Sequence, residues 1–316
     1  MPTDARMGSP ARPRLAGIDA ARGAAVVAMV LYHLCWDLNH FGWLRLDLFT
    51  APAWLAARAV ILSSFLFLAG VSLVLTARAG FDARRFRRRW LVLAVAAAAI
   101  TMVSLAVFPA SPILFGVLHH LAVGSLLGLG FLRLPAAATL VAGAVVLALP
   151  GWAALPLFDP PWLSWIGMAA HDPDANDYVP LVPWFGVMLV GIALGKLWDA
   201  KGWARAQGGG RTAAPLVWLG RHSLAVYLIH QPVLFAALWG LTAAGLSPIN
   251  SEERAFHTSC VESCVGNGAE APLCAQSCSC IAGSLKQRGL WRGVLEQRLD
   301  PDTITEVTAV IRSCRP

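Results

Sequence analysis

The stretch WLAARAVILSSFLFLAGVSLVLT (residues 54–76) contains one charged side chain, Arg58, and is otherwise almost entirely apolar. A helix rises about 1.5 Å per residue, so a run of this length covers the ~30 Å hydrocarbon core of a bilayer. An uncharged apolar run of this length is typical of a membrane span and unusual in a soluble domain. The stretch therefore predicts a transmembrane helix.

Six further apolar runs lie around this one and are separated by short charged or proline-rich breaks. They fall at about residues 23–41, 90–108, 113–132, 136–155, 182–199 and 222–246. We therefore expect an all-α fold, a polytopic transmembrane bundle of about seven spans. The expected organisation is a basic N-terminal segment (residues 1–21), the bundle (22–246) and a cysteine-rich tail (247–316).

The composition of the whole chain agrees with a membrane protein. Hydrophobic residues make up 57% and charged residues only 14%, and the mean hydropathy is +0.61, whereas soluble domains are about a quarter charged. The formal net charge of +7 could suggest a nucleic-acid partner. The arginines, however, cluster beside apolar runs, where the positive-inside rule expects them. We therefore expect a lipid bilayer as the partner, and no nucleic acid.

The basic residues orient the predicted spans, because Lys and Arg concentrate in cytoplasmic loops. If the spans alternate in direction, the clusters all fall on one side, which is then the cytoplasmic side together with the N-terminus. The tail then lies on the opposite side. The clusters are Arg12, Arg14 and Arg22 before the first run, Arg78 and residues 84–89 between the second and third, and Lys196, Lys201, Arg205 and Arg211 between the sixth and seventh.

Six of the seven cysteines lie in the tail, and an even count outside the membrane suits an oxidising compartment. Their spacing places cysteine pairs one turn apart on two short antiparallel helices. This predicts the disulfides Cys260–Cys278, Cys264–Cys274 and Cys280–Cys314. Zinc is the alternative, but its usual ligand spacing is C-x2-C, so we favour disulfides. The seventh cysteine, Cys35, is expected to be a small apolar filler in the first span.

His33, Asp37 and His40 recur at i, i+4 and i+7 in the first run and therefore share one helix face. Ionisable side chains inside a membrane are costly and usually functional. A carboxylate between two imidazoles can fix the tautomer of one and raise its basicity. These three residues are therefore candidates for a catalytic base and the group that orients it.

Two more runs carry polar side chains that could stabilise developing negative charge in a transition state. The fourth run contains His119 and His120, and the seventh places Ser223, Tyr227 and His230 on one face. Such a face must point into the bundle and not toward lipid. The structural alternative for His119, His120 and His222 is a simple hydrogen bond to a neighbouring helix.

The remaining charged clusters have less specific interpretations. The arginine run at 84–89 is typical of a topology and lipid-headgroup anchor, and Arg22 beside Asp19 fits either an ion pair or a phosphate site. His171 with Asp172, Asp174 and Asp177 fits a hydrophilic loop better than a metal site. No metal cofactor is expected.

Several segments resemble known families in the order in which they occur. The opening LAGIDAARGAAVVAMVLYH (15–33) is similar to the D-x-x-R-G-x-x-x-x-x-M opening of the bacterial DUF1624 membrane family, which is related to heparan-alpha-glucosaminide N-acetyltransferase. The last similar segment also resembles the closing helix of membrane acyltransferases that acylate extracytoplasmic sugars. The other similar segments are WDLNHFGW (36–43), FGVLHHLAV (115–123), DYVPLVPWFGVMLVGIALG (177–195) and LGRHSLAVYLIHQPVLF (219–235).

The resemblance implies transfer of an acetyl or other acyl group from cytoplasmic acetyl-CoA to an amine or hydroxyl of a sugar or envelope glycan outside a bacterial inner membrane, with the tail then periplasmic. His40 occupies the place of the key histidine of the eukaryotic relatives, and His33 stands where they have an asparagine. Both therefore remain candidates for the base, with Asp37. The phosphates of coenzyme A are expected at the cytoplasmic side near Arg22, Arg221 and the arginine run at 84–89, which are positively charged and close to the membrane. The sequence is compatible with an oligomer.

Two other classes of function fit the intramembrane histidines. A proton-coupled transporter would use them as a relay, but the inverted repeats that are frequent in transporters are not apparent. A haem- or metal-binding membrane protein would use them as ligands. That alternative predicts visible absorbance or bound metal in the purified protein.

Overall fold

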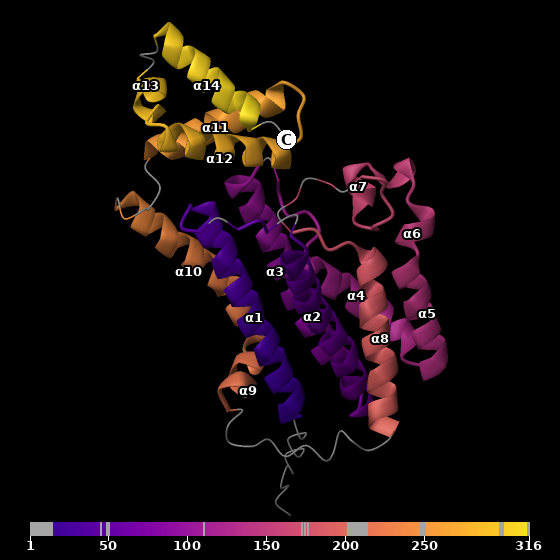
Figure 1. Cartoon of the computed structure of the whole chain (residues 1–316). Coiled ribbons are helices and arrows are strands. Elements are labelled where there is room, and N and C mark those ends of the chain that lie inside the picture. Colours follow the sequence, from indigo (N-terminus) through magenta and orange to yellow (C-terminus); the bar gives the residue numbers. More distant parts are fainter. Residues whose placement is uncertain are drawn as a thin grey trace, which may run out of the picture. The chain divides into compact units, whose positions relative to one another are not determined.

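The computed structural model describes residues 15–44, 46–48, 51–109, 111–171, 173, 175, 177–200, 214–244, 246, 251–296 and 300–314. Within these residues every regular element is a helix (Figure 1), so the fold is all-α as predicted. Several residues on which the sequence analysis relied lie outside the described part: Arg12, Arg14, Asp172, Asp174, Lys201, Arg205 and Arg211.

Five helices in the described residues are long and apolar enough to cross a membrane. The chain is therefore a multi-pass membrane protein. Each of the five corresponds to one of the predicted runs. They are α1 (Ala16–His40), α2 (Pro52–Arg78), α3 (Ala83–Val107), α8 (Leu181–Ala200) and α10 (Ser223–Ala243).

The fourth and fifth predicted spans form shorter helices than expected. These are α4 (Val117–Phe131), with 15 residues, and α5 (Ala136–Ala148), with 13. At about 1.5 Å per residue both fall short of the ~30 Å bilayer core. Pro135 directly precedes α5, and Pro150 begins the four-residue helix α6 (Pro150–Ala153) after it. Proline favours the start of a helix and interrupts its interior, which divides the apolar runs.

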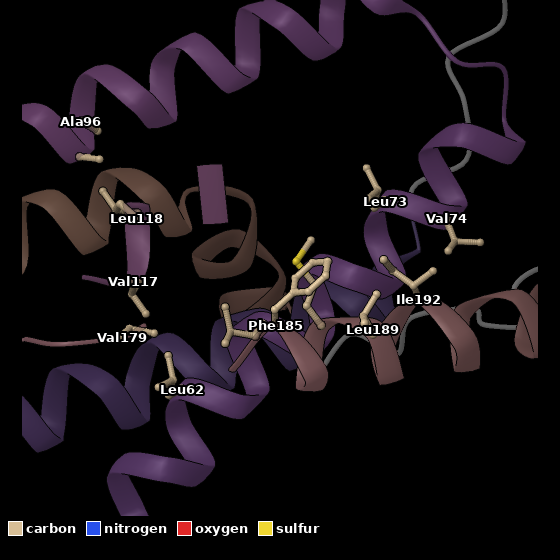
Figure 2. Close-up of a cluster of buried hydrophobic side chains, with 13 residues drawn as sticks. Leu62, Leu73, Val74, Ala96, Val117, Leu118, Val179, Phe185, Leu189 and Ile192 are labelled. Atoms are coloured by element: carbon tan, nitrogen blue, oxygen red, sulfur yellow. The ribbon is translucent and has the colours of Figure 1, made fainter. Parts of the chain in front are cut away.

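Helix α8 packs directly against α2, α4 and α5. Leu66 of α2 and Met188, Leu189 and Ile192 of α8 are 0% exposed, and Figure 2 shows side chains of α2 and α8 meeting in this core. The backbones approach closely: a Cβ added to Gly191 would lie 2.3 Å from the carbonyl oxygen of Phe67. Small residues allow this contact between membrane helices, where the hydrophobic effect does not drive association.

Several helix termini that carry basic residues, Arg22, Lys196 and Arg221, lie at one end of this bundle, which we call the basic end. Arg22, near the start of α1, donates to Ser72 near the end of α2 at 2.8 Å. Arg221 pairs with Asp19 at 3.3 Å and so joins α9 (Ala214–Arg221) to the start of α1. Lys196, near the end of α8, bonds to the end of α4. The start of α1 thus meets the end of α2, and the ends of α4 and α8 meet, as expected for spans that alternate in direction.

Replacing Lys196 by methionine is expected to lower the free energy of unfolding by about 2–4 kcal/mol. Lys196 is 7% exposed, and its ammonium donates to the carbonyl oxygens of Phe131 and Leu134 and to Thr139 Oγ1 at 2.6, 2.7 and 2.9 Å. Methionine keeps the length of the side chain but leaves these acceptors without their donor. Thermal unfolding in detergent measures the effect. The exposed Arg133→Met is the control, and equal midpoints for the two variants would contradict the prediction.

The remaining helices are short or belong to the tail. A 3-10 turn (Pro156–Phe158) and α7 (Pro161–Ser164) precede α8. In the tail, α11 (Ser251–Gly266) packs along α12 (Ala271–Gln287), followed by α13 (Trp291–Leu295) and α14 (Pro301–Ser313). Three disulfides join these helices, in the same pairs that the spacing predicts: Cys260–Cys278, Cys264–Cys274 and Cys280–Cys314.

The described residues form two compact units. The first contains those of 1–36 and 47–234, and the second those of 37–46 and 235–316. Helices α1 and α10 therefore contribute residues to both units. The first unit holds the bundle core and its basic end, and the second holds the disulfide-linked tail helices.

Candidate functional site

Two imidazoles and a phenol meet inside the first unit. The ring centroids of His33 on α1 and His230 on α10 are 5.0 Å apart. Tyr227, one turn before His230, has its ring centroid 5.9 Å from that of His230. Within the described residues, the ring nitrogens of His33 have no hydrogen-bond partner. The fold therefore brings a histidine with free nitrogens from the first span to a second histidine on the last.

The backbone of α10 fixes the tautomer of His230. Its Nδ1 lies 2.8 Å from the carbonyl oxygen of Tyr227 and 3.1 Å from that of Val226. Both are acceptors, so Nδ1 carries the hydrogen in the neutral ring. Nε2 is buried and has no partner among the described residues. A neutral His230 thus offers a lone pair at Nε2, and the expected role as an oxyanion donor would require a protonated ring.

Close backbone contacts hold α1 and the α9–α10 segment in register. A Cβ on Gly23 would lie 2.0 Å from the carbonyl oxygen of Leu216, and one on Gly220 would lie 1.8 Å from that of Asp19. Larger residues at either glycine would push the segments apart. Because α10 begins directly after α9, this contact sets the height at which His230 meets His33.

Asp19 links the two arginines that were expected to hold the donor. Its carboxylate is 3.3 Å from Arg22 Nη1 and 3.3 Å from Arg221 Nε. Two guanidinium groups around one carboxylate leave one positive charge in excess at the basic end. The ion pair and the phosphate site considered for Arg22 are therefore compatible, because an arginine bound to a carboxylate keeps further donors.

His119 and His120 are anchored by the loops around them. His119 Nδ1 accepts from the backbone N–H of Gly116 at 3.3 Å, which leaves Nε2 to donate to Thr101 Oγ1 at 3.1 Å. His120 is 0% exposed, and its Nδ1 faces the carbonyl oxygens of Val179 and Pro180 at 3.4 and 3.2 Å. These bonds support the structural alternative considered for both histidines.

Asp177 is a further candidate residue of the functional site, although the sequence analysis assigned it to a hydrophilic loop. Its Oδ2 accepts from the backbone N–H of Val117 at 3.4 Å and interacts electrostatically with Tyr227. Burial raises the pKa of Asp177, while the Val117 N–H and Arg58 act in the opposite direction. Burial thus makes the charged carboxylate less favourable than in water, and the Val117 N–H partly compensates for this. The signal in the sequence is the position of Asp177 directly before the apolar segment that leads into α8.

The other two residues of the first-helix stripe belong to the second unit. Asp37 is 0% exposed. The ring of His40 packs against those of Phe41 and Phe235, with centroid distances of 5.1 and 5.6 Å, and the two phenyl rings contact each other at 4.8 Å. Helix α1 is continuous from Ala16 to His40, so the predicted helical spacing of His33, Asp37 and His40 is present.

The loop before α8 holds an exposed ion pair. His171 Nδ1 lies 3.1 Å from Asp159 Oδ2, and this hydrogen bond lowers the pKa of Asp159. In the part of the chain that the structure describes, no three His, Cys, Asp or Glu side chains gather closely enough to hold a metal ion.

The comparisons with known proteins give one match. The family described as "Heparan-alpha-glucosaminide N-acetyltransferase, catalytic" matches residues 14–232. The matched region includes His33, His230 and the first-helix stripe and ends within α10, before the cysteine-rich tail. No curated protein and no solved structure matches the chain.

Proposed function

The chain belongs to the heparan-alpha-glucosaminide N-acetyltransferase catalytic family, and from this premise we propose that it moves an acetyl or other acyl group from cytoplasmic acyl-CoA to an amine or hydroxyl of an extracytoplasmic sugar or envelope glycan. The observation that carries the proposal is the pairing of His33 with His230 inside a membrane bundle. An ionisable pair in a membrane is costly to keep without a function.

We assign the role of general base to His33. It takes the proton from the amine or hydroxyl of the acceptor as that group attacks the thioester carbonyl. The tetrahedral intermediate then collapses and the acyl group stays on the acceptor. Coenzyme A leaves as a thiolate, which takes the proton from the His33 imidazolium and so regenerates the base. Asp37, one turn after His33 on α1, is the proposed orienting carboxylate.

The partners of His33 on α10 have distinct proposed roles. The lone pair on Nε2 of His230 is the proposed acceptor of a hydrogen bond from His33 once His33 has taken the proton, and so stabilises the imidazolium that forms. The hydroxyl of Tyr227 is the proposed donor to the oxygen on which negative charge develops. His40, which packs against two aromatic rings, is the alternative base.

The proposed donor site lies at the basic end of the bundle. Arg22 and Arg221, which share Asp19, would contact phosphate groups of coenzyme A. The positive-inside rule then makes this end cytoplasmic. It follows that the tail would lie in the periplasm, if the membrane is a bacterial inner membrane.

The experiment that tests the proposal is acyl transfer in sealed vesicles. Radiolabelled acetyl-CoA is supplied to inverted vesicles that contain glucosamine or envelope extract, and labelled acceptor is measured after lysis. Transfer is expected in inverted vesicles and not in right-side-out vesicles, because acetyl-CoA does not cross the bilayer. Vesicles without the protein are the control. Absence of transfer above this control, with folded protein and with every donor and acceptor supplied, would refute the enzyme assignment.

A further inference from the structure

A groove of about 940 Å³ runs along α3, and neither His33 nor His230 is among the residues that line it. Its basic part is lined by four arginines from the first two turns of the helix, Arg84, Arg85, Arg87 and Arg88. Its floor continues along the same helix and is apolar, and Leu228 of α10 lines it as well. The groove thus has one strongly cationic part and one hydrocarbon part.

The cationic part carries excess positive charge. Arg85 Nε lies 3.8 Å from Asp82, and Asp82 also caps the start of α3 by accepting from the backbone N–H groups of Arg84 and Arg85. Arg84, Arg87 and Arg88 have no carboxylate within ion-pair distance among the described residues. Guanidinium groups in this arrangement favour a phosphate, which they bind through several N–H groups.

The apolar part begins within one turn of the arginines. Leu91 and Val95 follow Arg88 at i+3 and i+7 and share its helix face. Leu91, Val92 and Val95 are 48%, 50% and 68% exposed, so the floor is open to a hydrocarbon chain. Beyond Arg88, every residue that lines the groove is apolar.

The order of arginines and apolar residues along the groove distinguishes between two phosphate-bearing amphiphiles, acyl-coenzyme A and a membrane phospholipid. Coenzyme A separates its phosphates from the acyl group by a pantetheine arm with two amides, and an apolar floor offers those amides no hydrogen-bond partner. A membrane phospholipid carries its acyl chains directly below the phosphate. The groove matches the second arrangement.

We propose that the groove along α3 binds an anionic membrane phospholipid, with its phosphate at Arg84, Arg87 and Arg88 and an acyl chain along Leu91 and Val95. Anionic lipids are favoured over zwitterionic ones because the arginines are in excess over carboxylates. None of the residues that line the groove is among those assigned to acyl transfer, so the proposal stands whether or not the chain is an acyltransferase.

The test is native mass spectrometry of the detergent-solubilised chain titrated with phosphatidylglycerol or phosphatidylcholine. Phosphatidylglycerol is expected to bind at least about tenfold more tightly. Arg88→Gln should weaken its binding roughly fivefold. Arg89→Gln, which removes the same charge from an adjacent residue that does not line the groove, should change it less than about twofold.

Two further arms complete the test. Val95→Trp keeps every charge but fills the floor, and should weaken phosphatidylglycerol binding, with size-exclusion chromatography confirming that the variant is folded. Coenzyme A added in excess should not displace the lipid. Equal effects of Arg88→Gln and Arg89→Gln, equal binding of the two lipids, an unchanged affinity in folded Val95→Trp, or displacement by coenzyme A would each overturn the proposal.

Discussion

Replacing His33 by alanine is expected to reduce acyl transfer at least about 100-fold, since general bases contribute roughly 10²- to 10⁴-fold to rate. His33 has free ring nitrogens among the described residues and lies 5.0 Å, centroid to centroid, from His230. The initial rate of labelled product formation in inverted vesicles measures the loss, normalised to the amount of folded protein.

Two matched substitutions separate the base from the other histidines. His40→Ala removes the rival candidate, whose ring packs against Phe41 and Phe235, and should lower the rate less than about tenfold. His171→Ala removes an exposed histidine that pairs with Asp159 and should leave the rate unchanged. If His40→Ala abolished transfer while His33→Ala retained it, the base would be His40.

The sequence predicts the five long spans because an apolar run longer than the bilayer core has few alternatives to a helix. The short lengths of α4 and α5 were harder to predict from the sequence. Pro135 and Pro150 lie within or beside these apolar runs, but the hydropathy of the runs does not show where the helices end. Two disulfide pairs, Cys260–Cys278 and Cys264–Cys274, could be predicted because they depend on local helical spacing, and Cys280–Cys314 then followed as the remaining pair. The charge pattern predicted which helix ends carry the basic residues. Lys196, however, was counted as a loop cation, although it bonds to the end of α4 from a buried position.

The candidate site could be predicted only in part, because helical periodicity gives the face of a residue and not its partner. The spacing placed His33 on a polar stripe and His230 on another. Their meeting depends on the tight contact at Gly23 and Gly220, which no periodicity reveals. Asp177 was grouped with its acidic neighbours in the sequence, whereas in the structure it bonds to the start of α4.

Replacing His230 by phenylalanine is expected to lower kcat roughly 10- to 100-fold while leaving the KM for acetyl-CoA within about twofold. Phenylalanine keeps a ring of similar size beside His33 but removes the lone pair at Nε2 and the Nδ1–H that bonds to α10. The donor site is unaffected, because the proposed contacts to coenzyme A lie at the basic end. A fall in kcat alone would mean that His230 acts on the reacting groups after both substrates are bound.

The matched control for this variant is His222→Phe. His222 also bonds through Nδ1 to a carbonyl oxygen one turn back, that of Trp218 at 2.8 Å, but it is exposed and pairs with no catalytic candidate. Loss of the helix hydrogen bond is therefore common to both variants, and only His230→Phe removes a group beside His33. Equal losses in the two variants would assign His230 a purely structural role, whereas a loss confined to His230→Phe supports a histidine pair that shares the proton during transfer.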